Sequence, residues 1–357
     1  MFLKSLNWPI LTSTILLLSV GILVIFSSSP ELATQQFIFA IFGLIFYFLI
    51  SKLNYEAFRS LAKPLYVIVL GLLLLVFILG FETRGSIRWI PLGIFNIQPS
   101  EFAKPVMILL LADFWARNKP SWLSIIKSLL LISLPLLFVF KQPDLGTTLT
   151  ILALSLGMLF LAKISYKKIL ILLSVILLIL PLVWFGLQDY QKSRVTSFLS
   201  PTADPLGEGY NAIQSTIAVG SGEFSGRGLG HGTQSRLQFL PEFRTDFIFA
   251  AIAEELGFLG SILILVIYLW LILYCFKVAS ATRDIFGFLM SAGVGINILF
   301  QTVVNIGMNI GLLPITGITL PLISYGGSSL LATLISLGFV ASVAKKRRKV
   351  DIESPIG

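Results

Sequence analysis

Seven ionisable side chains lie inside or beside long apolar segments of this chain: Glu101, Lys104, Asp113, Asp144, Asp246, Glu254 and Glu255. Charged groups are costly in an apolar environment, so residues of this kind usually have a functional role. Asp246 is the most informative, because it ends a long polar segment and precedes an apolar run at 247–249. Partial burial there would favour the protonated carboxyl and make it a usable general base. The alternative is that Asp246 only caps the helix that follows.

A second polar group is Glu101 with Lys104, in the sequence Gln98-Pro99-Ser100-Glu101-Phe102-Ala103-Lys104. Ser100 after a proline is a good start for a helix, and residues three apart then share one helix face. Two interpretations stay open here. The pair neutralises itself inside the protein, or Lys104 faces a phosphate in the outer leaflet of a membrane.

Asp144 and the glutamates 254 and 255 have similar alternatives. Asp144 follows Gln142-Pro143 and precedes an apolar run, so it either caps that helix or contributes to a polar site. Glu254 and Glu255 lie about two helical turns beyond Asp246, roughly 12 Å further along a helix axis. Acidic groups at that depth need hydrogen-bonding partners or a polar cavity, and a satisfied structural network is the favoured interpretation.

A glycine-rich run covers residues 220–232 and ends at His231 and Gly232. It follows no βαβ pattern, so it does not indicate a dinucleotide site. It forms either flexible backbone beside a substrate groove or a surface turn. His231 is the only histidine and Cys275 the only cysteine, which excludes a histidine-rich metal cage and an internal disulfide. A divalent cation such as Mg²⁺ or Mn²⁺, held by Asp246 or Asp144 together with substrate phosphates, stays open. No organic cofactor is expected.

The elements that position these residues must be membrane helices. The 357 residues are 56% hydrophobic and only 12% charged, more apolar surface than a soluble domain of this size could bury. A spanning helix needs roughly 20 mostly apolar residues. We therefore predict an all-α integral membrane protein with about ten transmembrane helices, near residues 10–26, 35–50, 61–80, 101–116, 124–140, 145–162, 168–186, 248–276, 286–308 and 319–343.

The basic residues predict the orientation. Alternate connections carry the lysines and arginines, and the C-terminal segment is basic from Lys345 to Lys349. Under the positive-inside rule this pattern places both termini in the cytoplasm. It also explains the net charge of +9 by topology, and no nucleic-acid partner is expected. Residues 187–247, between the seventh and eighth spans, then form a long extracytoplasmic loop, which we expect to fold as a cap within a single membrane domain covering residues 1–357.

The motifs resemble those of the SEDS (shape, elongation, division and sporulation) family of polytopic glycosyltransferases, and the elongation-type RodA branch in particular. The resemblance covers nearly the whole chain in the right order. The matching segments are Gln98-Pro99-Ser100-Glu101 with Lys104, Gln142 to Thr147, Asp204 to Tyr210, Gln214-Ser215, Gly220 to Gly230, His231 to Ser235, Phe239 to Glu242, Thr245 to Ala250, Glu254 to Gly257, and Pro321 to Ser328.

The resemblance implies a peptidoglycan glycosyltransferase of the bacterial cytoplasmic membrane that polymerises lipid II during cell elongation. It implies a class B penicillin-binding protein and other elongation-complex membrane proteins as partners. Asp246 matches the essential aspartate of the family. The candidate substrate-binding residues are Lys104, Glu101, Asp144, Arg194, Gln214, His231, Gln234, Glu242, Arg244 and Ser324. One departure is Arg244, which stands where the family commonly has histidine and does not titrate near neutral pH.

The expected reaction is an inverting sugar transfer in which Asp246 accepts a hydroxyl proton and undecaprenyl pyrophosphate leaves. Lys104, Arg194, Arg244 or a divalent ion would then meet the charge on the departing phosphate. Three other functions are open. A polyprenyl-lipid flippase or transporter would usually show inverted repeats with broken helices, and no such repeat is visible. A non-catalytic scaffold for a penicillin-binding protein would leave Asp246 without a purpose. A ligase-type transferase would act on a different polyprenyl substrate.

Overall fold

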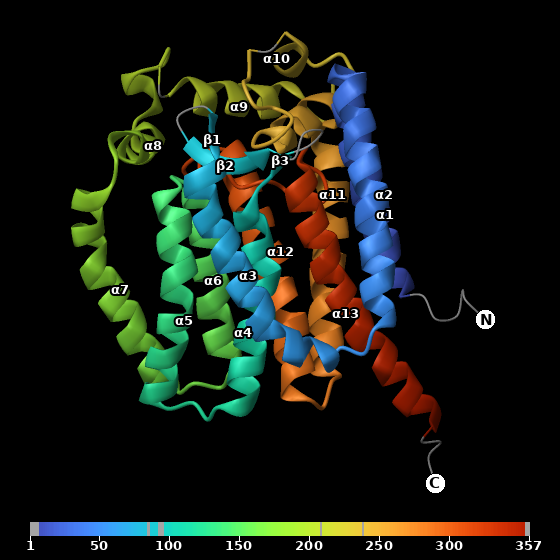
Figure 1. Cartoon of the computed structure of the whole chain (residues 1–357). Helices are drawn as coiled ribbons and strands as arrows, with labels where there is room; N and C mark the ends of the chain where they lie inside the picture. Colours follow the sequence, from blue (N-terminus) through green and yellow to red (C-terminus); the bar gives the residue numbers. More distant parts are fainter. Residues whose placement is uncertain (1–6, 84–85, 92–95, 208, 238, 354–357) are drawn as a thin grey trace.

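The computed structural model describes residues 7–83, 86–91, 96–207, 209–237 and 239–353. Ten long helices dominate the described part of the chain (Figure 1). They are α1 (Trp8–Ser28), α2 (Pro30–Lys52), α3 (Ala57–Leu79), α4 (Pro99–Arg117), α5 (Trp122–Lys141), α6 (Leu145–Leu161), α7 (Tyr166–Gly186), α11 (Ile248–Ser280), α12 (Ile285–Asn309) and α13 (Gly327–Glu353). Among the residues that the structure describes, seven helices contain segments long and apolar enough to cross a membrane: α1, α2, α3, α5, α11, α12 and α13.

Each of the ten apolar runs predicted from the sequence falls on one of these helices. The main difference is at the last run, where α13 begins only at Gly327, so residues 319–326 are a connection and not helix. Pro321 lies in this connection, and a proline removes a backbone donor that a helix interior needs. Ser324 is therefore on a loop that returns beside the start of α11, and that position matters for the site.

The centre of the bundle is formed by α4, α12 and α13. Helix α4 packs against α3, α6, α12 and α13, and nearly all of its side chains are buried. This explains why it tolerates charged residues that an exposed membrane helix would not. Helix α7 is the opposite case, because none of its described side chains is buried and it lies at the periphery of the bundle (Figure 1).

Short elements cover one end of the bundle. They are the helices α8 (Asp189–Leu199), η2 (Pro201–Ala203), α9 (Tyr210–Ser221) and α10 (Thr233–Arg236), which we call the cap, and a small antiparallel sheet in the order β1 (Phe81–Thr83), β2 (Ser86–Pro91), β3 (Asn96–Ile97). Figure 1 shows the cap over the end of the bundle where α11 begins. The sheet, which the sequence did not predict, fills the connection between α3 and α4.

The glycine-rich run has a structural role that neither sequence interpretation included. Helix α11 is broken at Gly257, whose φ of 67° and ψ of −165° are not helical. The glycine-rich loop replaces the helical hydrogen bonds that are lost at this break. The amides of Arg227 and Gly228 donate to the carbonyls of Glu254 and Glu255, each at 3.0 Å. Returning bonds run from the amides of Phe258 and Leu259 to carbonyls of the loop at 2.9 and 3.2 Å.

Candidate functional site

Asp246 lies in a tight turn that leads from the cap into α11. The carbonyl of Glu242, which has a positive φ of 55°, accepts hydrogen bonds from the amides of Thr245 and Phe247 at 3.0 and 3.2 Å. The Thr245 hydroxyl also donates to the Glu242 carboxylate at 3.0 Å. The N-cap position of α11 is occupied by Phe247 and has no side-chain cap. Phe247, and not Asp246, therefore occupies the capping position, and the Asp246 side chain is half-buried in the turn.

Three successive backbone carbonyls hold this turn in place. The Arg244 carbonyl accepts from the Tyr325 amide at 2.9 Å, and the Thr245 carbonyl accepts from the Ser324 hydroxyl at 2.6 Å. The Asp246 carbonyl accepts from two amide side chains of α12, Asn305 at 2.9 Å and Asn309 at 3.0 Å. Such a fully bonded turn fixes where the Asp246 side chain starts.

Asn309 also completes the helix start. Its side-chain oxygen accepts from the Ala250 amide at 3.0 Å, which satisfies one of the free donors in the first turn of α11. We did not identify Asn305 and Asn309 from the sequence. The available signal was the repeat of amide residues every four positions in an otherwise apolar helix, which places them on one face: Asn297, Gln301, Asn305 and Asn309.

The contacts around Gly317 place one cation, Arg194, close to the Asp246 carboxylate. A Cβ atom built on Gly317 would lie 3.5 Å from Oδ2 of Asp246 and 3.7 Å from NH1 of Arg194. The two charged groups are therefore separated by no more than the sum of those distances. Gly317 has a φ of +74°, a conformation that favours glycine, and it adds no side chain to the space beside these two groups. Gly146, at the start of α6, packs against the backbone of Thr316 and Gly317.

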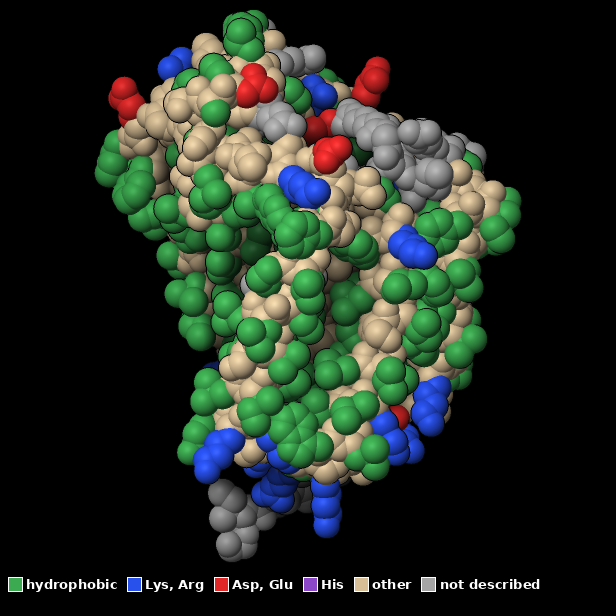
Figure 2. All heavy atoms as spheres, turned by 90° about the vertical axis from the view of Figure 1, so that its left-hand side faces the viewer, with side chains coloured by type: hydrophobic (Ala, Val, Ile, Leu, Met, Phe, Trp, Pro, Cys, Tyr) green, Lys and Arg blue, Asp and Glu red, His purple; other side chains and the backbone are tan. Residues whose placement is uncertain are grey.

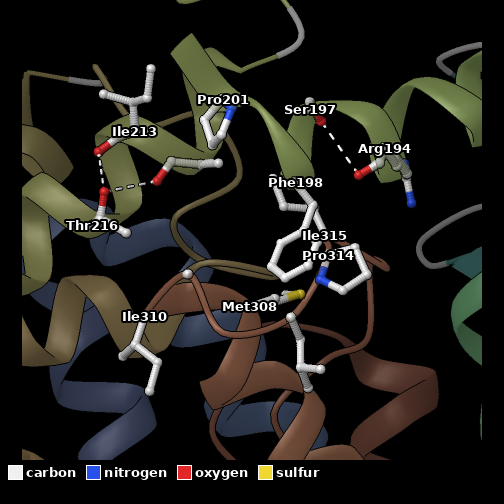
Figure 3. Close-up of a pocket in the computed structure, with 13 residues that line it drawn as sticks. Arg194, Ser197, Phe198, Pro201, Ile213, Thr216, Met308, Ile310, Pro314 and Ile315 are labelled. Carbon is white, nitrogen blue, oxygen red and sulfur yellow. Dashed lines mark hydrogen bonds between the residues drawn. The ribbon is translucent and has the colours of Figure 1, made fainter. Parts of the chain in front are cut away.

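A cavity of about 290 Å³ opens beside Arg194 (Figure 3). Helices α8 and α9 of the cap form one side, and the end of α12 with the connection that follows it forms the other. In Figure 3 the ring of Phe198 lies beside Pro314 and above Met308. The cavity is lined by Arg194, Ser197, Phe198, Pro201, Ala212, Ile213, Thr216, Met308, Ile310, Gly311, Leu313, Pro314 and Ile315. The cavity is therefore mostly apolar, with Arg194 as its charged group.

Glu101 and Lys104 form a buried ion pair on α4. Their charged atoms are 2.7 Å apart, and the two side chains are only 8% and 4% exposed. This geometry matches the neutralised-pair interpretation. Because only 4% of the Lys104 side chain is exposed, it is poorly placed to reach a phosphate outside the bundle, and Arg194 is the better placed cation.

Asp144 caps α6, as one of the two sequence interpretations proposed. Its Oδ1 accepts from the Thr147 amide at 3.0 Å, and its Oδ2 accepts from the side chains of Gln98 and Ser100 at 3.0 and 3.1 Å. With three donors and an exposure of 4%, the carboxylate connects the starts of α4 and α6. These bonds leave little capacity for a metal ion, and the described residues contain no cluster of three His, Cys, Asp or Glu side chains.

Arg244 and Ser324 connect the turn to other helices. The Arg244 guanidinium donates to the hydroxyl and carbonyl oxygens of Ser28 at 3.0 and 3.2 Å and lies 4.6 Å from the centre of the Phe243 ring. Burial lowers the pKa of this guanidinium. Ser324 is 4% exposed, accepts from the Leu320 amide and donates to Thr245, and its carbonyl accepts from Gln36. The structure gives both residues positioning contacts.

The other candidates lie in the cap. His231 is exposed, with Nδ1 3.0 Å from the Leu229 carbonyl. The backbone amide of Gln234 donates to the Glu254 carboxylate at 2.8 Å. The Glu255 carboxylate accepts from the Ser27 hydroxyl at 2.8 Å, so both glutamates have hydrogen-bonding partners, as expected for a structural network. Gln214 on α9 is half-buried, and its side-chain oxygen has no hydrogen-bond partner within the protein.

The comparisons with known proteins agree with one another. Residues 7–349 match a family model described as "Cell cycle protein" and named for FtsW, RodA and SpoVE. The peptidoglycan glycosyltransferase MrdB of Escherichia coli K12 is 40% identical over 312 residues, which cover 87% of this chain and 84% of that protein.

Two solved structures share the fold. One, titled "Structural coordination of polymerization and crosslinking by a peptidoglycan synthase complex", has a TM-score of 0.82 at 34% identity, with 96% of this chain and 98% of that chain covered. The crystal structure of the rod shape determining protein RodA of Thermus thermophilus has a TM-score of 0.73 at 29% identity, with coverage of 96% and 97%.

Proposed function

We propose that this chain, which belongs to the FtsW/RodA/SpoVE family of cell cycle proteins, is a peptidoglycan glycosyltransferase that polymerises lipid II. The observation that carries the proposal is the proximity of the Asp246 carboxylate and the Arg194 guanidinium, both beside Gly317, to a cavity under the cap. The carboxylate supplies a base and the guanidinium supplies a fixed positive charge.

In the proposed reaction, Asp246 accepts the proton of the acceptor sugar's 4-hydroxyl group. The freed oxygen forms a bond to the anomeric carbon of the donor, and the bond from that carbon to the pyrophosphate oxygen breaks. Undecaprenyl pyrophosphate leaves with inversion at the anomeric carbon. Because a pyrophosphate carries its own negative charge, the reaction needs a cation to bind it and not the second carboxylic acid that many glycosidases use.

Arg194 suits the phosphate because a guanidinium can donate two parallel hydrogen bonds to phosphate oxygens. It lines the cavity next to Asp246, whereas Lys104 is buried in its ion pair and Arg244 donates to Ser28. Positioned general-base catalysis contributes roughly 10²–10⁴-fold, and each well-placed donor to the developing charge adds a comparable factor.

A divalent cation would fit this reaction only with ligands from the substrate. Asp246 supplies one carboxylate, while Asp144 already accepts three hydrogen bonds. We therefore propose that any Mg²⁺ or Mn²⁺ is held by Asp246 with substrate phosphate oxygens, and its chemistry would be to neutralise the pyrophosphate. Treatment with a chelator followed by addition of each metal tests this requirement.

We further propose that the protein lies in the bacterial cytoplasmic membrane with the cap outside and both termini inside. The support is the basic end of the bundle opposite the cap, which Figure 2 shows below a broad hydrophobic band. A structural relative comes from a complex that couples polymerization to crosslinking. By analogy, the partner here would be a class B penicillin-binding protein within an elongation complex.

The experiment is to incubate the purified chain with fluorescent lipid II, with and without the crosslinking partner, and to separate the products on a gel. A glycosyltransferase gives a ladder of glycan strands. A flippase or a scaffold gives no new glycosidic bond, and either result would overturn the proposal.

A further inference from the structure

The bundle end opposite the cap carries a second charged feature, which the proposed reaction does not use. Basic side chains from the α4–α5 connection, the first turns of α5, the α6–α7 connection and the start of α7 gather there. We call this group the basic patch, and its members are Arg117, Lys119, Lys127, Lys163, Lys167 and Lys168. All of them are exposed except Lys168, which is half-buried.

Lys168 joins the two connections into one surface. Its Nζ donates to the Pro120 carbonyl at 3.0 Å and lies 5.8 Å from the centre of the Trp122 ring. Helices α5 and α7 both begin here, at Trp122 and Tyr166, so the positive ends of two long helix dipoles point at the same surface. Helices α4 and α6 end at the same surface, at Arg117 and Leu161, so the opposite ends of their dipoles offset this effect and the positive potential of the patch comes from its lysines.

Two basic residues elsewhere at this end of the bundle form ion pairs. Arg59 pairs with Asp284 at 2.8 Å, and Lys346 pairs with Glu56 at 2.6 Å. Within the patch, Arg117 pairs with Asp113 at 2.7 Å. The next acid along the chain is Asp144, which caps α6 at the cap end. Among the described residues, the five lysines of the patch form no ion pair, so their charge can meet an anionic ligand.

Apolar and aromatic side chains adjoin the patch on the side of the hydrophobic band. Trp122 is 42% exposed and Tyr166 is 69% exposed, which is typical of rings at a membrane–water interface. Exposed leucine and isoleucine side chains continue from them along α5 and α7, namely Leu123, Ile126, Leu170 and Ile171. A ligand here therefore meets cations at one end and an apolar surface at the other.

We propose that the basic patch binds an anionic glycerophospholipid, with the phosphodiester on the lysines and the acyl chains along the exposed faces of α5 and α7. Lipid is the occupant because this end of the bundle lies at the headgroup level whichever leaflet it faces, and the apolar surface continues into the hydrocarbon. A basic residue near a membrane surface contributes about 1 kcal/mol of attraction to anionic lipid, so several together select anionic over zwitterionic headgroups. This binding is independent of the proposed sugar transfer and can be measured without lipid II.

The test is native mass spectrometry of the purified full-length chain titrated with phosphatidylglycerol or phosphatidylcholine. The patch variant is Lys119→Gln/Lys163→Gln/Lys167→Gln. The matched control is Lys63→Gln/Lys277→Gln/Arg283→Gln, which removes three exposed charges at the same end outside the patch. We expect phosphatidylglycerol affinity to fall roughly tenfold or more in the patch variant and less than threefold in the control.

Two results would overturn the proposal. One is an equal loss in both variants, which would mean that only the net charge matters. The other is binding of soluble glycerophosphate as tight as that of the lipid, which would mean that the apolar faces contribute nothing. Thermal unfolding of both variants, measured alongside, confirms that the comparison is made between folded proteins.

Discussion

Gly317 offers a test of the geometry between Asp246 and Arg194. In Gly317→Ala, the added methyl carbon would lie 3.5 Å from the carboxylate and 3.7 Å from the guanidinium. These are ordinary contact distances, so the methyl group fits the protein without substrate. In the proposed complex it would occupy space that a phosphate or sugar oxygen of the substrate must use. A hydrogen bond to a charged group contributes about 1.5–3 kcal/mol, so losing one in the reaction should lower the rate roughly ten- to hundredfold.

The substitution also has a backbone cost, which the control must reproduce. Alanine at a φ of +74° costs about 1–2 kcal/mol. Gly230 has a nearly identical φ of +75°, and a Cβ there would be 3.8 Å from its nearest neighbour, the Ser27 carbonyl. Gly230→Ala therefore carries the same strain away from Asp246.

The assay is the initial rate of lipid II polymerisation by each purified variant, with thermal unfolding measured on the same samples. We expect both variants to lose similar stability and only Gly317→Ala to lose most of its rate. Equal rates for the two variants would refute the proposal that Asp246 and Arg194 act on the substrate beside Gly317.

Two further predictions concern the groups that hold the site. Asn309→Ala should destabilise the protein by about 2–3 kcal/mol, because the Ala250 amide loses its partner and the Asp246 carbonyl keeps only its bond from Asn305. Asn297→Ala on the same helix face should cost less, since the side-chain oxygen of Asn297 has no protein partner. Unfolding in detergent with increasing SDS measures the stability of both variants. Equal losses of stability would contradict the role of Asn309 in holding the turn at Asp246. Lys104→Met should destabilise by about 3–5 kcal/mol because it leaves Glu101 buried without its cation, and adding Glu101→Leu should recover part of that loss. A double variant less stable than either single variant would contradict the ion-pair interpretation.

The helices could be predicted from the sequence because each has its own local signal. A run of about 20 apolar residues has one stable state in lipid, so α1, α2 and α3 needed no knowledge of the rest of the chain. The place of Asp246 just before α11 could be predicted in the same way, from its position between a polar segment and an apolar one. For Asp144 the sequence left two alternatives, and the structure shows the capping one. The spacing of three residues placed Glu101 and Lys104 on one helix face, but only the structure decided that they form an ion pair.

The remaining features depend on contacts between distant segments. The role of the glycine-rich run is to bond to the backbone around Gly257, about thirty residues later, and nothing in either segment alone indicates the other. The same holds for the hydrogen bonds to the Asp246 carbonyl, which come from side-chain amides of α12 some sixty residues away. Arg194 could be named as a candidate cation, but its position next to Asp246 depends on how α8 folds over the connection after α12.

The most direct test of the central claim is the polymerisation rate of Asp246→Asn on purified lipid II. Asparagine keeps the size of the side chain and leaves the bonds to the backbone carbonyl intact, while removing the ability to accept the hydroxyl proton. Asp189→Asn, an exposed acid at the start of α8, serves as the control. We expect the Asp246 variant to fold normally and to lose at least roughly a hundredfold in rate, the lower end for a general base. A folded variant that keeps more than about a tenth of the wild-type rate would contradict the role of this carboxylate.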